Sequence, residues 1–301
     1  MTAVIGIFMA LAAVTLTYVS VLARWLRRSR ARGEPSPVPS AGQLTLGFVT
    51  NFFDTLGIGS FATTTAGFKF WKMLPDELIP GTLNVGHTAS SVMQAFIFII
   101  AIQMDPLTLI LLLASAACGA WFGAGLVAGL PRRSVQLGMG TALLVSASVM
   151  TLSQLNLLPV GGAALALHGW KLAVGIGGNF VLGALMTLGI GLYAPCMMLV
   201  SLLGMNPSVA FPIMMGSCAF LMPVASLRFI ERGAFQPRVA MGLAIGGVFA
   251  VPLAAFVVKS LPLTVLRWVV IGVVVYAAVL MLRSAKADVV RGRALGVTPE
   301  I

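Results

Sequence analysis

Apolar runs long enough to cross a lipid bilayer follow one another along this 301-residue sequence, and they constrain its fold more than any other feature. A bilayer core about 30 Å thick is crossed by about 20 helical residues. The stretches of that length are 2–24, 78–103, 107–130, 134–152, 208–229, 238–258 and 263–283. The sequence therefore predicts an all-α, polytopic integral membrane protein.

The composition excludes the main soluble alternatives. Hydrophobic residues make up 59% of the chain and charged residues 9%, which is more apolar sequence than a water-soluble globule can bury. A net charge of +11 would suggest a nucleic-acid partner in a soluble protein, but here the basic residues lie in short clusters between apolar runs, a pattern that sets membrane orientation. The three cysteines form no CxxC pattern. We therefore expect no nucleic-acid partner, no metal site and no cofactor.

Two further apolar stretches, 41–73 and 172–204, are too long for one crossing, because each would reach about 50 Å as a straight helix. Both are interrupted near the middle by Leu-Gly-Ile-Gly, at 56–59 and at 188–191. A chain that reverses at membrane depth needs backbone angles that glycine adopts most easily. Each stretch is therefore predicted to be a re-entrant hairpin, with returning half-helices that begin at Ser60 and Leu192.

The basic clusters orient these elements, since clusters of Lys and Arg favour the cytoplasmic side. Residues 24–32 hold five arginines, so the first span is interpreted as an anchor with its N-terminus outside, rather than a cleaved signal peptide. The same rule puts both ends of the first hairpin inside, both ends of the second outside, and the C-terminal tail in the cytoplasm. On this path the basic residues outside the cytoplasm are Lys171, Lys259 and Arg267.

The two hairpins are also related in sequence. Residues 55–59 recur identically at 187–191, and Ala62, Met73, Pro75 and Pro80 recur at the same offset. Each half reads as a hairpin followed by three transmembrane helices, and an odd number of spans inverts the second copy in the membrane. The predicted segments are an N-terminal anchor and Arg/Pro-rich linker at 1–40, a first inverted repeat at 41–152, an extracytoplasmic connector at 153–171, a second repeat at 172–284 and a cytoplasmic tail at 285–301.

The hairpin tips are the predicted substrate site. Inverted-repeat transporters bind substrate near the membrane midplane, and two returning helices would point their N-termini there. Helix N-termini carry unpaired N–H groups and a partial positive charge, which favours an anion. The alternative is that the hydroxyls at the tips merely cap and pack helices, a role expected of Ser60 in either case. The candidate substrate-binding residues are Thr55, Gly57, Ile58, Gly59, Ser60, Thr63, Thr187, Gly189, Ile190, Gly191 and Tyr193.

Polar residues at helical spacing form one stripe on the span 78–103, and such stripes face a bundle interior or water. The stripe consists of Asn84, His87, Thr88, Ser91 and Gln94. Together with Asp54, one turn before the first glycine tip, His87 is the leading candidate for proton coupling, and Asn84 and Gln94 are included with them. The alternative is a neutral, hydrogen-bonded His87 and an Asp54 that caps or pairs locally.

Sulfur is concentrated in the second half. The residues concerned are Met186, Cys196, Met197, Met198, Met214, Met215, Cys218 and Met222. Soft ligands of this kind bind copper(I), so a soft metal-ion permease is an alternative function, although adaptable packing is the favoured interpretation. An intramembrane enzyme is a weaker alternative, because the sequence has no HExxH or GxSxG motif. We therefore do not expect an enzyme.

The paired motifs LGIGSFA with LPDELIP, and LGIGLYAP with MNPSVAFP, resemble the TauE/SafE sulfite exporter family, also called TSUP, over most of residues 41–284. Members are bacterial and organellar membrane transporters, many of them for sulfite, thiosulfate, sulfoacetate or other organosulfonates. The resemblance implies a secondary transporter of the bacterial inner membrane that carries a small sulfur-containing anion by alternating access, with or without a coupled proton. The expected partners are this anion and membrane lipid, and the sequence leaves a homodimer open.

Overall fold

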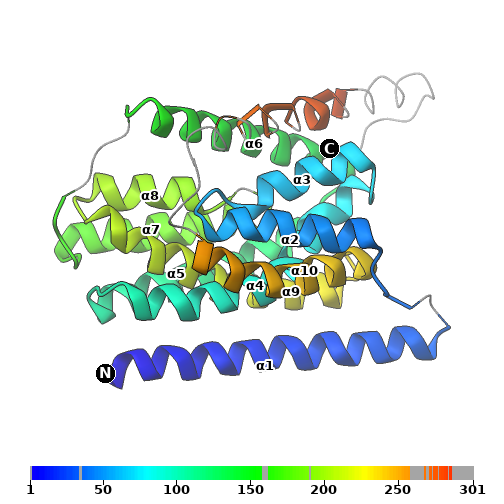
Figure 1. The fold of residues 1–301 in the computed structure, drawn as a ribbon, viewed down its shortest axis with the longest axis horizontal. Helices are drawn as coiled ribbons and strands as arrows, with labels where there is room; N and C mark the ends of the chain where they lie inside the picture. Colours follow the sequence, from blue (N-terminus) through cyan, green and yellow to red (C-terminus); the bar gives the residue numbers. More distant parts are fainter. Residues whose placement is uncertain are drawn as a thin grey trace.

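The computed structural model describes residues 2–33, 36–157, 162–189, 191–257, 268, 271–272, 274–276, 278–283 and 285–286 (Figure 1). Over this part of the chain there is no β-strand, which confirms the all-α fold. The helices are α1 (Thr2–Ala31), α2 (Ala41–Thr55), α3 (Ser60–Trp71), η1 (Asp76–Leu78), α4 (Ile79–Ala101), α5 (Pro106–Val127), α6 (Arg132–Gln154), α7 (Gly169–Met186), α8 (Tyr193–Leu202), η2 (Pro207–Val209), α9 (Ala210–Glu231) and α10 (Pro237–Val257).

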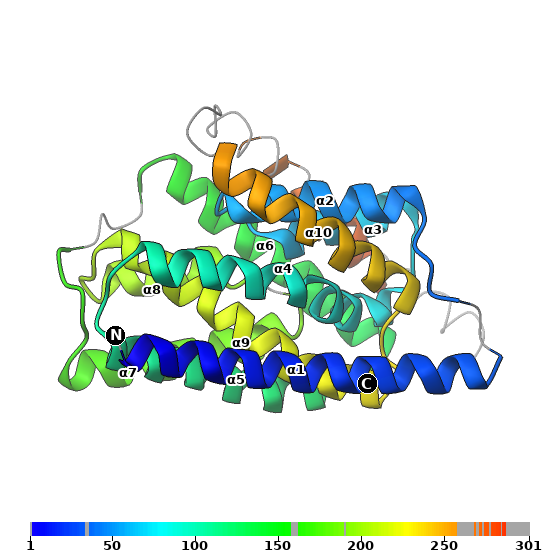
Figure 2. The same cartoon turned by 60° about the horizontal axis from the view of Figure 1, so that its bottom comes forward.

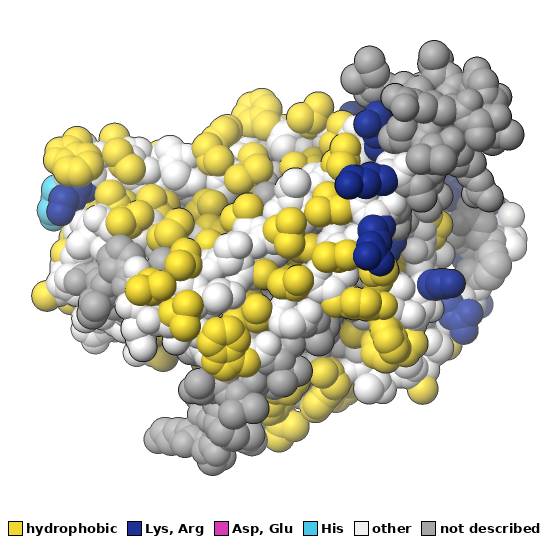
Figure 3. Space-filling view, turned by 90° about the horizontal axis from the view of Figure 1, so that it is seen from above, with side chains coloured by type: hydrophobic (Ala, Val, Ile, Leu, Met, Phe, Trp, Pro, Cys, Tyr) yellow, Lys and Arg dark blue, Asp and Glu magenta, His cyan; other side chains and the backbone are white. Residues whose placement is uncertain are grey.

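Seven of the described helices are long and apolar enough to cross a membrane, namely α1, α4 with η1, α5, α6, α7, α9 and α10. Of the last predicted span, 263–283, the structure describes residues 268, 271–272, 274–276 and 278–283, which are helical. Figure 3 shows hydrophobic side chains over the middle of one face, with Lys and Arg side chains gathered mainly at one end. An apolar middle between polar ends matches a lipid bilayer. The protein is therefore a polytopic membrane protein.

The first helix is longer than predicted. The apolar span 2–24 continues as regular helix to Ala31, because arginine and alanine are good helix formers and carry α1 beyond the apolar part. Figure 2 shows α1 lying along the outside of the bundle, where it packs mainly on α9. Its Tyr18 hydroxyl donates to the Val85 carbonyl of α4 at 2.8 Å.

A central pair of helices, α4 and α9, forms the core of the bundle. The polar stripe of α4 is fully buried, and part of it faces α9: the Ser91 hydroxyl donates to Met222 Sδ at 3.1 Å, and the Thr88 and Ser226 hydroxyls lie 3.4 Å apart. Around this pair, α5 packs on α9 and α10 packs on α4. The polar residues predicted to face the interior therefore lie at its centre.

Both long apolar stretches are broken at the predicted glycines and fold back on themselves. The φ angles of Gly57, Gly59 and Gly189 are 83°, 90° and 93°, in the left-handed region that favours glycine. Gly67 of α3 lies against Leu46 of α2, and Gly178 of α7 lies against Leu199 of α8. The second returning helix begins at Tyr193 with Leu192 as its N-cap, one residue later than predicted.

The open ends of the two hairpins lie at opposite ends of α5. The first hairpin opens beside the start of α10, where the Arg238 Nε donates to the Val38 carbonyl at 2.7 Å. The second opens beside the start of α5, where the Leu167 N–H donates to the Thr108 hydroxyl at 3.1 Å. Gly129, just after α5, faces Arg232, just before α10, so the end of α5 is near the start of α10. Inversion of the whole second half stays a prediction.

Each hairpin packs against a helix of the opposite half: α2 against α10, and α7 against α5. Gly246 of α10 faces the Leu44 carbonyl of α2, and Gly119 of α5 faces the Phe180 carbonyl of α7. Small residues let helix backbones approach closely in membranes. The two hairpins are thus held between the halves, which positions both tips inside the bundle.

Candidate functional site

The tips of the two hairpins meet through Tyr193, the first residue of α8. Its hydroxyl lies 3.2 Å from Oδ2 of Asp54, in the last turn of α2, and 3.1 Å from Oε1 of Gln94 on α4. These residues lie far apart in the sequence and come from both predicted repeats. The structure therefore brings together two predicted proton-coupling residues, Asp54 and Gln94, and one predicted substrate-binding residue, Tyr193.

Asp54 accepts hydrogen bonds from several elements. The Gln94 side-chain N–H₂ donates to Asp54 Oδ2 and to the Thr55 hydroxyl, each at 2.9 Å. The backbone N–H and the hydroxyl of Ser60, the first residue of α3, lie close enough to the same carboxylate to interact with it. Asp54 is 2% exposed and Gln94 is fully buried. We call Asp54, Thr55, Ser60, Gln94 and Tyr193 the Asp54 cluster. Its carboxylate lies at the α3 N-terminus, the place predicted for a substrate anion.

Sulfur atoms border this cluster on the side of the second half. The Tyr193 hydroxyl lies 2.7 Å from Met215 Sδ, and Cys218 Sγ lies 3.7 Å from Met186 Sδ. The Cys218 thiol is also close enough to Asp54 to interact with it electrostatically. Within the described residues, no three His, Cys, Asp or Glu side chains are grouped as a metal site. The contact between Tyr193 and Met215 joins the consecutive α-helices α8 and α9, and sequence reasoning missed it.

His87 belongs to a second polar cluster. Its Nδ1 lies 2.9 Å from Asn51 Oδ1, and its Nε2 lies 3.0 Å from the Thr64 hydroxyl. The Asn51 N–H₂ donates to the Gly47 carbonyl at 2.7 Å, which leaves Oδ1 to accept from His87 and from Ser90. A neutral imidazole with its hydrogen on Nδ1 satisfies these contacts. They support a positioning role, in which His87 holds α2 and α3 to α4. Sequence reasoning overlooked Asn51, although an amide in an apolar hairpin was a usable signal.

Other predicted residues bond locally. The Thr63 hydroxyl contacts the Gly59 and Ser60 carbonyls, and the Thr187 hydroxyl donates to the Ala184 carbonyl at 2.6 Å. Such bonds to the preceding turn leave the hydroxyl hydrogen unavailable to a ligand. The Asn84 side-chain N–H₂ donates to the Pro80 carbonyl, so Asn84 joins neither cluster through a bond among the described residues. Ile58 is buried, whereas Ile190 lies outside the described residues.

The four tip glycines differ in what surrounds them. A Cβ on Gly57 would touch the Phe211 ring at 3.4 Å, and one on Gly189 would meet the Met139 side chain. At Gly59 and Gly191, no atom of the described residues lies within 4 Å of that position. Open space therefore borders one glycine of each tip, which leaves room for a ligand to approach the backbone.

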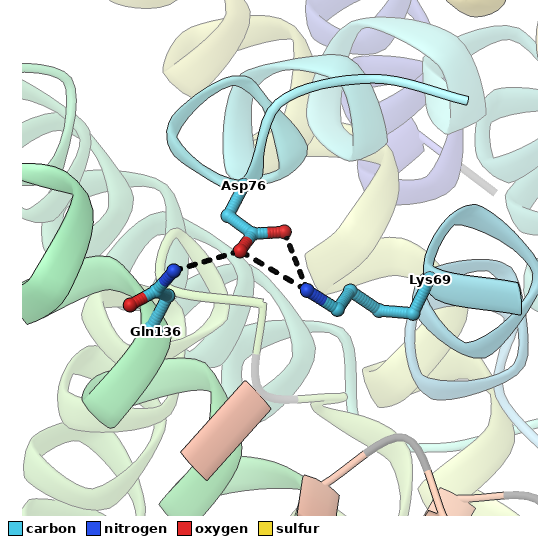
Figure 4. A network of polar contacts seen from close by, with 3 residues as sticks. All are labelled: Lys69, Asp76 and Gln136. Carbon is cyan, nitrogen blue, oxygen red and sulfur yellow. Dashed lines mark hydrogen bonds and ion pairs between the residues drawn. The ribbon is translucent and has the colours of Figure 1, made fainter. Parts of the chain in front are cut away.

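A partly buried ion pair fixes the open end of the first hairpin (Figure 4). Asp76 of η1 binds Lys69 Nζ of α3 at 2.8 and 3.0 Å, and accepts from the Gln136 N–H₂ of α6 at 2.8 Å. One turn further along α6, Met139 contacts Gly189 at the second tip. Helix α6 therefore connects the open end of the first hairpin with the tip of the second. Sequence reasoning did not single out this ion pair.

The family described as sulfite exporter TauE/SafE has a model that matches residues 1–150, from α1 through most of α6. No curated protein and no solved structure matches this chain. The match covers the first hairpin and the polar stripe of α4, and it agrees with the resemblance carried by the paired glycine motifs. With its membrane-spanning helices and matching motifs, this chain belongs to the sulfite exporter TauE/SafE family.

Proposed function

We propose that this protein is a secondary transporter that moves a small sulfur-containing anion across the bacterial inner membrane. The substrate class is sulfite, thiosulfate, sulfoacetate or another organosulfonate, in keeping with the family, whose description suggests a membrane transporter rather than an enzyme. The observation that carries the proposal is the meeting of the two broken helices, where Tyr193 at the start of α8 bonds Asp54 at the end of α2. Broken helices that meet between halves are typical of substrate sites in secondary transporters.

The chemistry of the tips suits an oxyanion. Ser60 N–H, the Ser60 hydroxyl and the Tyr193 hydroxyl are neutral donors around one point. Sulfite and sulfonate groups spread their charge over three oxygens, so several neutral donors can share it. Among the described residues, no Lys or Arg side chain is hydrogen-bonded to the Asp54 cluster. An anion held without a cationic partner is released more readily, as a transport cycle requires.

The way the hairpins are held supports transport by alternating access. Each hairpin lies in its own half but packs on a helix of the other, so a rocking motion of the halves displaces both tips together. The end rich in Lys and Arg (Figure 3) is the cytoplasmic one by the positive-inside rule, which places the N-terminus of α1 outside. Lipid surrounds the apolar faces, and a homodimer is an open part of the proposal.

Uptake of labelled sulfite, thiosulfate and sulfoacetate into proteoliposomes tests this function. We expect saturable uptake of at least one anion, and a loss of roughly tenfold or more in Gly191→Leu, whose side chain would fill the space at the second tip. Gly177→Leu is the matched control, because Gly177 is exposed on α7 with no described atom near its Cβ position. Full uptake of every anion by Gly191→Leu would refute the site.

A soft metal-ion permease is the rival function, and the sulfur atoms beside the tip favour it. Met215 contacts Tyr193, and Met186 contacts Cys218, so thioethers and a thiol lie next to the proposed site. Copper(I) uptake by the same vesicles separates the two functions. Saturable copper uptake without flux of any of the three anions would favour the rival.

A further inference from the structure

Asp54 lies where a bound anion would lie. Its carboxylate interacts with the Ser60 N–H at the start of α3, which is the end of the helix that carries partial positive charge. A substrate anion needs the same donors. Two negative charges that share one set of donors would lie close together and repel strongly in a site of low dielectric constant. The ionised carboxylate and the anion therefore exclude each other from the tip.

The hydrogen bonds around Tyr193 show how this conflict can be resolved. The phenol has one hydrogen, but three acceptors surround its oxygen: Asp54 Oδ2, Gln94 Oε1 and Met215 Sδ. The Gln94 N–H₂ is directed at Asp54 and Thr55, so Gln94 Oε1 needs the phenol hydrogen. The contact between Tyr193 and Asp54 then holds a hydrogen only when the carboxyl group supplies it. Reversing the Gln94 amide would set its oxygen against Asp54, which again requires a proton there.

Among the described groups that face Asp54 there is no cation, so the carboxylate is neutralised by binding a proton. The titratable neighbours are the Tyr193 phenol from α8 and the Cys218 thiol from α9, while α3 and α4 contribute the neutral Ser60 and Gln94. No described Lys, Arg or His bonds the Asp54 carboxylate. On α4, His87 lies two helical turns before Gln94 and is bonded to Asn51 and Thr64 instead. A buried carboxylate without a cationic partner is stabilised by becoming neutral.

We propose that one proton binds Asp54 together with each substrate anion, so that the anion takes the place of the carboxylate at the α3 N-terminus. The inference rests on the proposed function and adds its coupling chemistry. For a monovalent anion the charge at the tip is the same before and after binding: the carboxylate supplies it first, and the substrate supplies it beside a neutral Asp54. Anion and proton then cross in the same direction, without net charge movement for a monovalent anion and with one net negative charge for a divalent anion such as thiosulfate. The two concentration gradients, together with the membrane potential for a divalent anion, set the direction of transport.

Linkage gives the quantitative test. If one proton is taken up per anion, the dissociation constant rises by up to about tenfold for each unit of pH increase, over the range in which empty Asp54 is ionised. Thiosulfate is the probe, with sulfoacetate where thiosulfate is not carried, because neither changes its charge near neutral pH. We expect Asp54→Asn, which resembles the neutral acid, to bind the anion with no pH dependence. It should catalyse exchange of labelled for unlabelled anion, but should not accumulate anion against its gradient when the vesicle exterior is acidic.

Asp105→Asn is the matched control, since Asp105 is a partly exposed N-cap of α5 and asparagine caps a helix equally well. It should keep the pH dependence of the wild-type protein. A second measurement needs no variant: in weakly buffered vesicles a pH-sensitive dye should report one proton entering with each anion. Anion transport with no proton movement, or an Asp54→Asn protein with the wild-type pH dependence, overturns this inference and leaves the proposed function standing. Absence of flux for all three anions overturns both.

Discussion

The two hairpins share a backbone design but not a chemistry. Each reverses at a Leu-Gly-Ile-Gly sequence and packs against a helix of the opposite half. The first hairpin carries Asn51, Asp54 and Thr64, which bond polar residues of α4. The second contributes Tyr193 to the same region and is otherwise bordered by thioethers and thiols. The two reversals share a backbone geometry, while the buried carboxylate lies on the side of the first hairpin.

This difference suggests how the halves move. Direct hydrogen bonds have fixed lengths and directions, so the first hairpin and α4 should move as one unit. Methionine side chains are flexible and fill irregular space, so the contact of the second hairpin with α9 can repack at little cost. We therefore expect the second hairpin to change its neighbours during transport, and the first to keep them.

The largest expected effect concerns the close packing of each hairpin against a glycine on a helix of the opposite half. In Gly246→Leu and Gly119→Leu, the new side chain would collide with the backbone of α2 or α7. Overpacking of this kind costs about 1–3 kcal/mol where neighbours can relax, and more against backbone. Both variants should lose most of the folded protein in detergent, as measured by thermal unfolding and size-exclusion profiles. Gly125→Leu, on α5 but with no described atom near its Cβ position, is the control. A normal unfolding midpoint in either variant would show that its hairpin is not held this tightly.

A smaller effect should separate the two hairpins. Gln94→Leu removes the N–H₂ donor of Asp54 and Thr55, and an unsatisfied buried polar group costs about 1–3 kcal/mol. Met186→Leu nearly conserves volume on the sulfur side and should cost less than about 1.5 kcal/mol. The unfolding midpoints of the two variants, measured in one detergent, should therefore differ clearly. Equal shifts would mean that the polar contacts of the first hairpin stabilise the fold no more than the sulfur packing of the second.

The tip glycines give a finer test. Gly189→Ala should destabilise the protein by about 1–2 kcal/mol, because its φ of 93° disfavours a Cβ and Met139 occupies the space. Gly191→Ala should have a smaller effect on stability, since no described atom lies near its Cβ position. Its anion affinity should fall instead, by a few-fold, because the methyl group enters the proposed substrate space. Measuring unfolding and uptake on the same preparations decides whether the second tip binds substrate or is only a turn.

The sequence predicted features that depend on local chemistry. The helix breaks at 56–59 and 188–191 follow from glycine backbone freedom and bilayer thickness, and the burial of Gln94 follows from helical spacing. The sequence did not predict which residues of distant helices contact one another. The bond from Tyr193 to Asp54 spans 139 residues of sequence, and periodicity shows which face of a helix is buried, not which residue of another helix it meets.

The same limit applies to the ends of elements and to paired charges. Helix α1 runs past its apolar residues because helix propensity, rather than bilayer thickness, decides where it ends. Lys69 and Asp76 lie seven residues apart across a turn whose conformation the sequence did not reveal. The Asp54 cluster could therefore be assembled in part from residue types, but its closure by the second hairpin required the three-dimensional structure.

The smallest expected effect concerns the Cys218 thiol, which interacts with Asp54. Cys218→Ala removes a buried sulfur that contacts Met186 at 3.7 Å, and should lower stability by about 1 kcal/mol or less, because a buried free cysteine packs as a small apolar residue. Anion uptake and its pH dependence should both remain, in contrast to Asp54→Asn. Copper(I) titration of the purified protein supplies the opposing measurement. Stoichiometric copper binding by the wild-type protein that disappears in Cys218→Ala would make the sulfur atoms a ligand set. The chemistry of the second hairpin would then be as specific as that of the first.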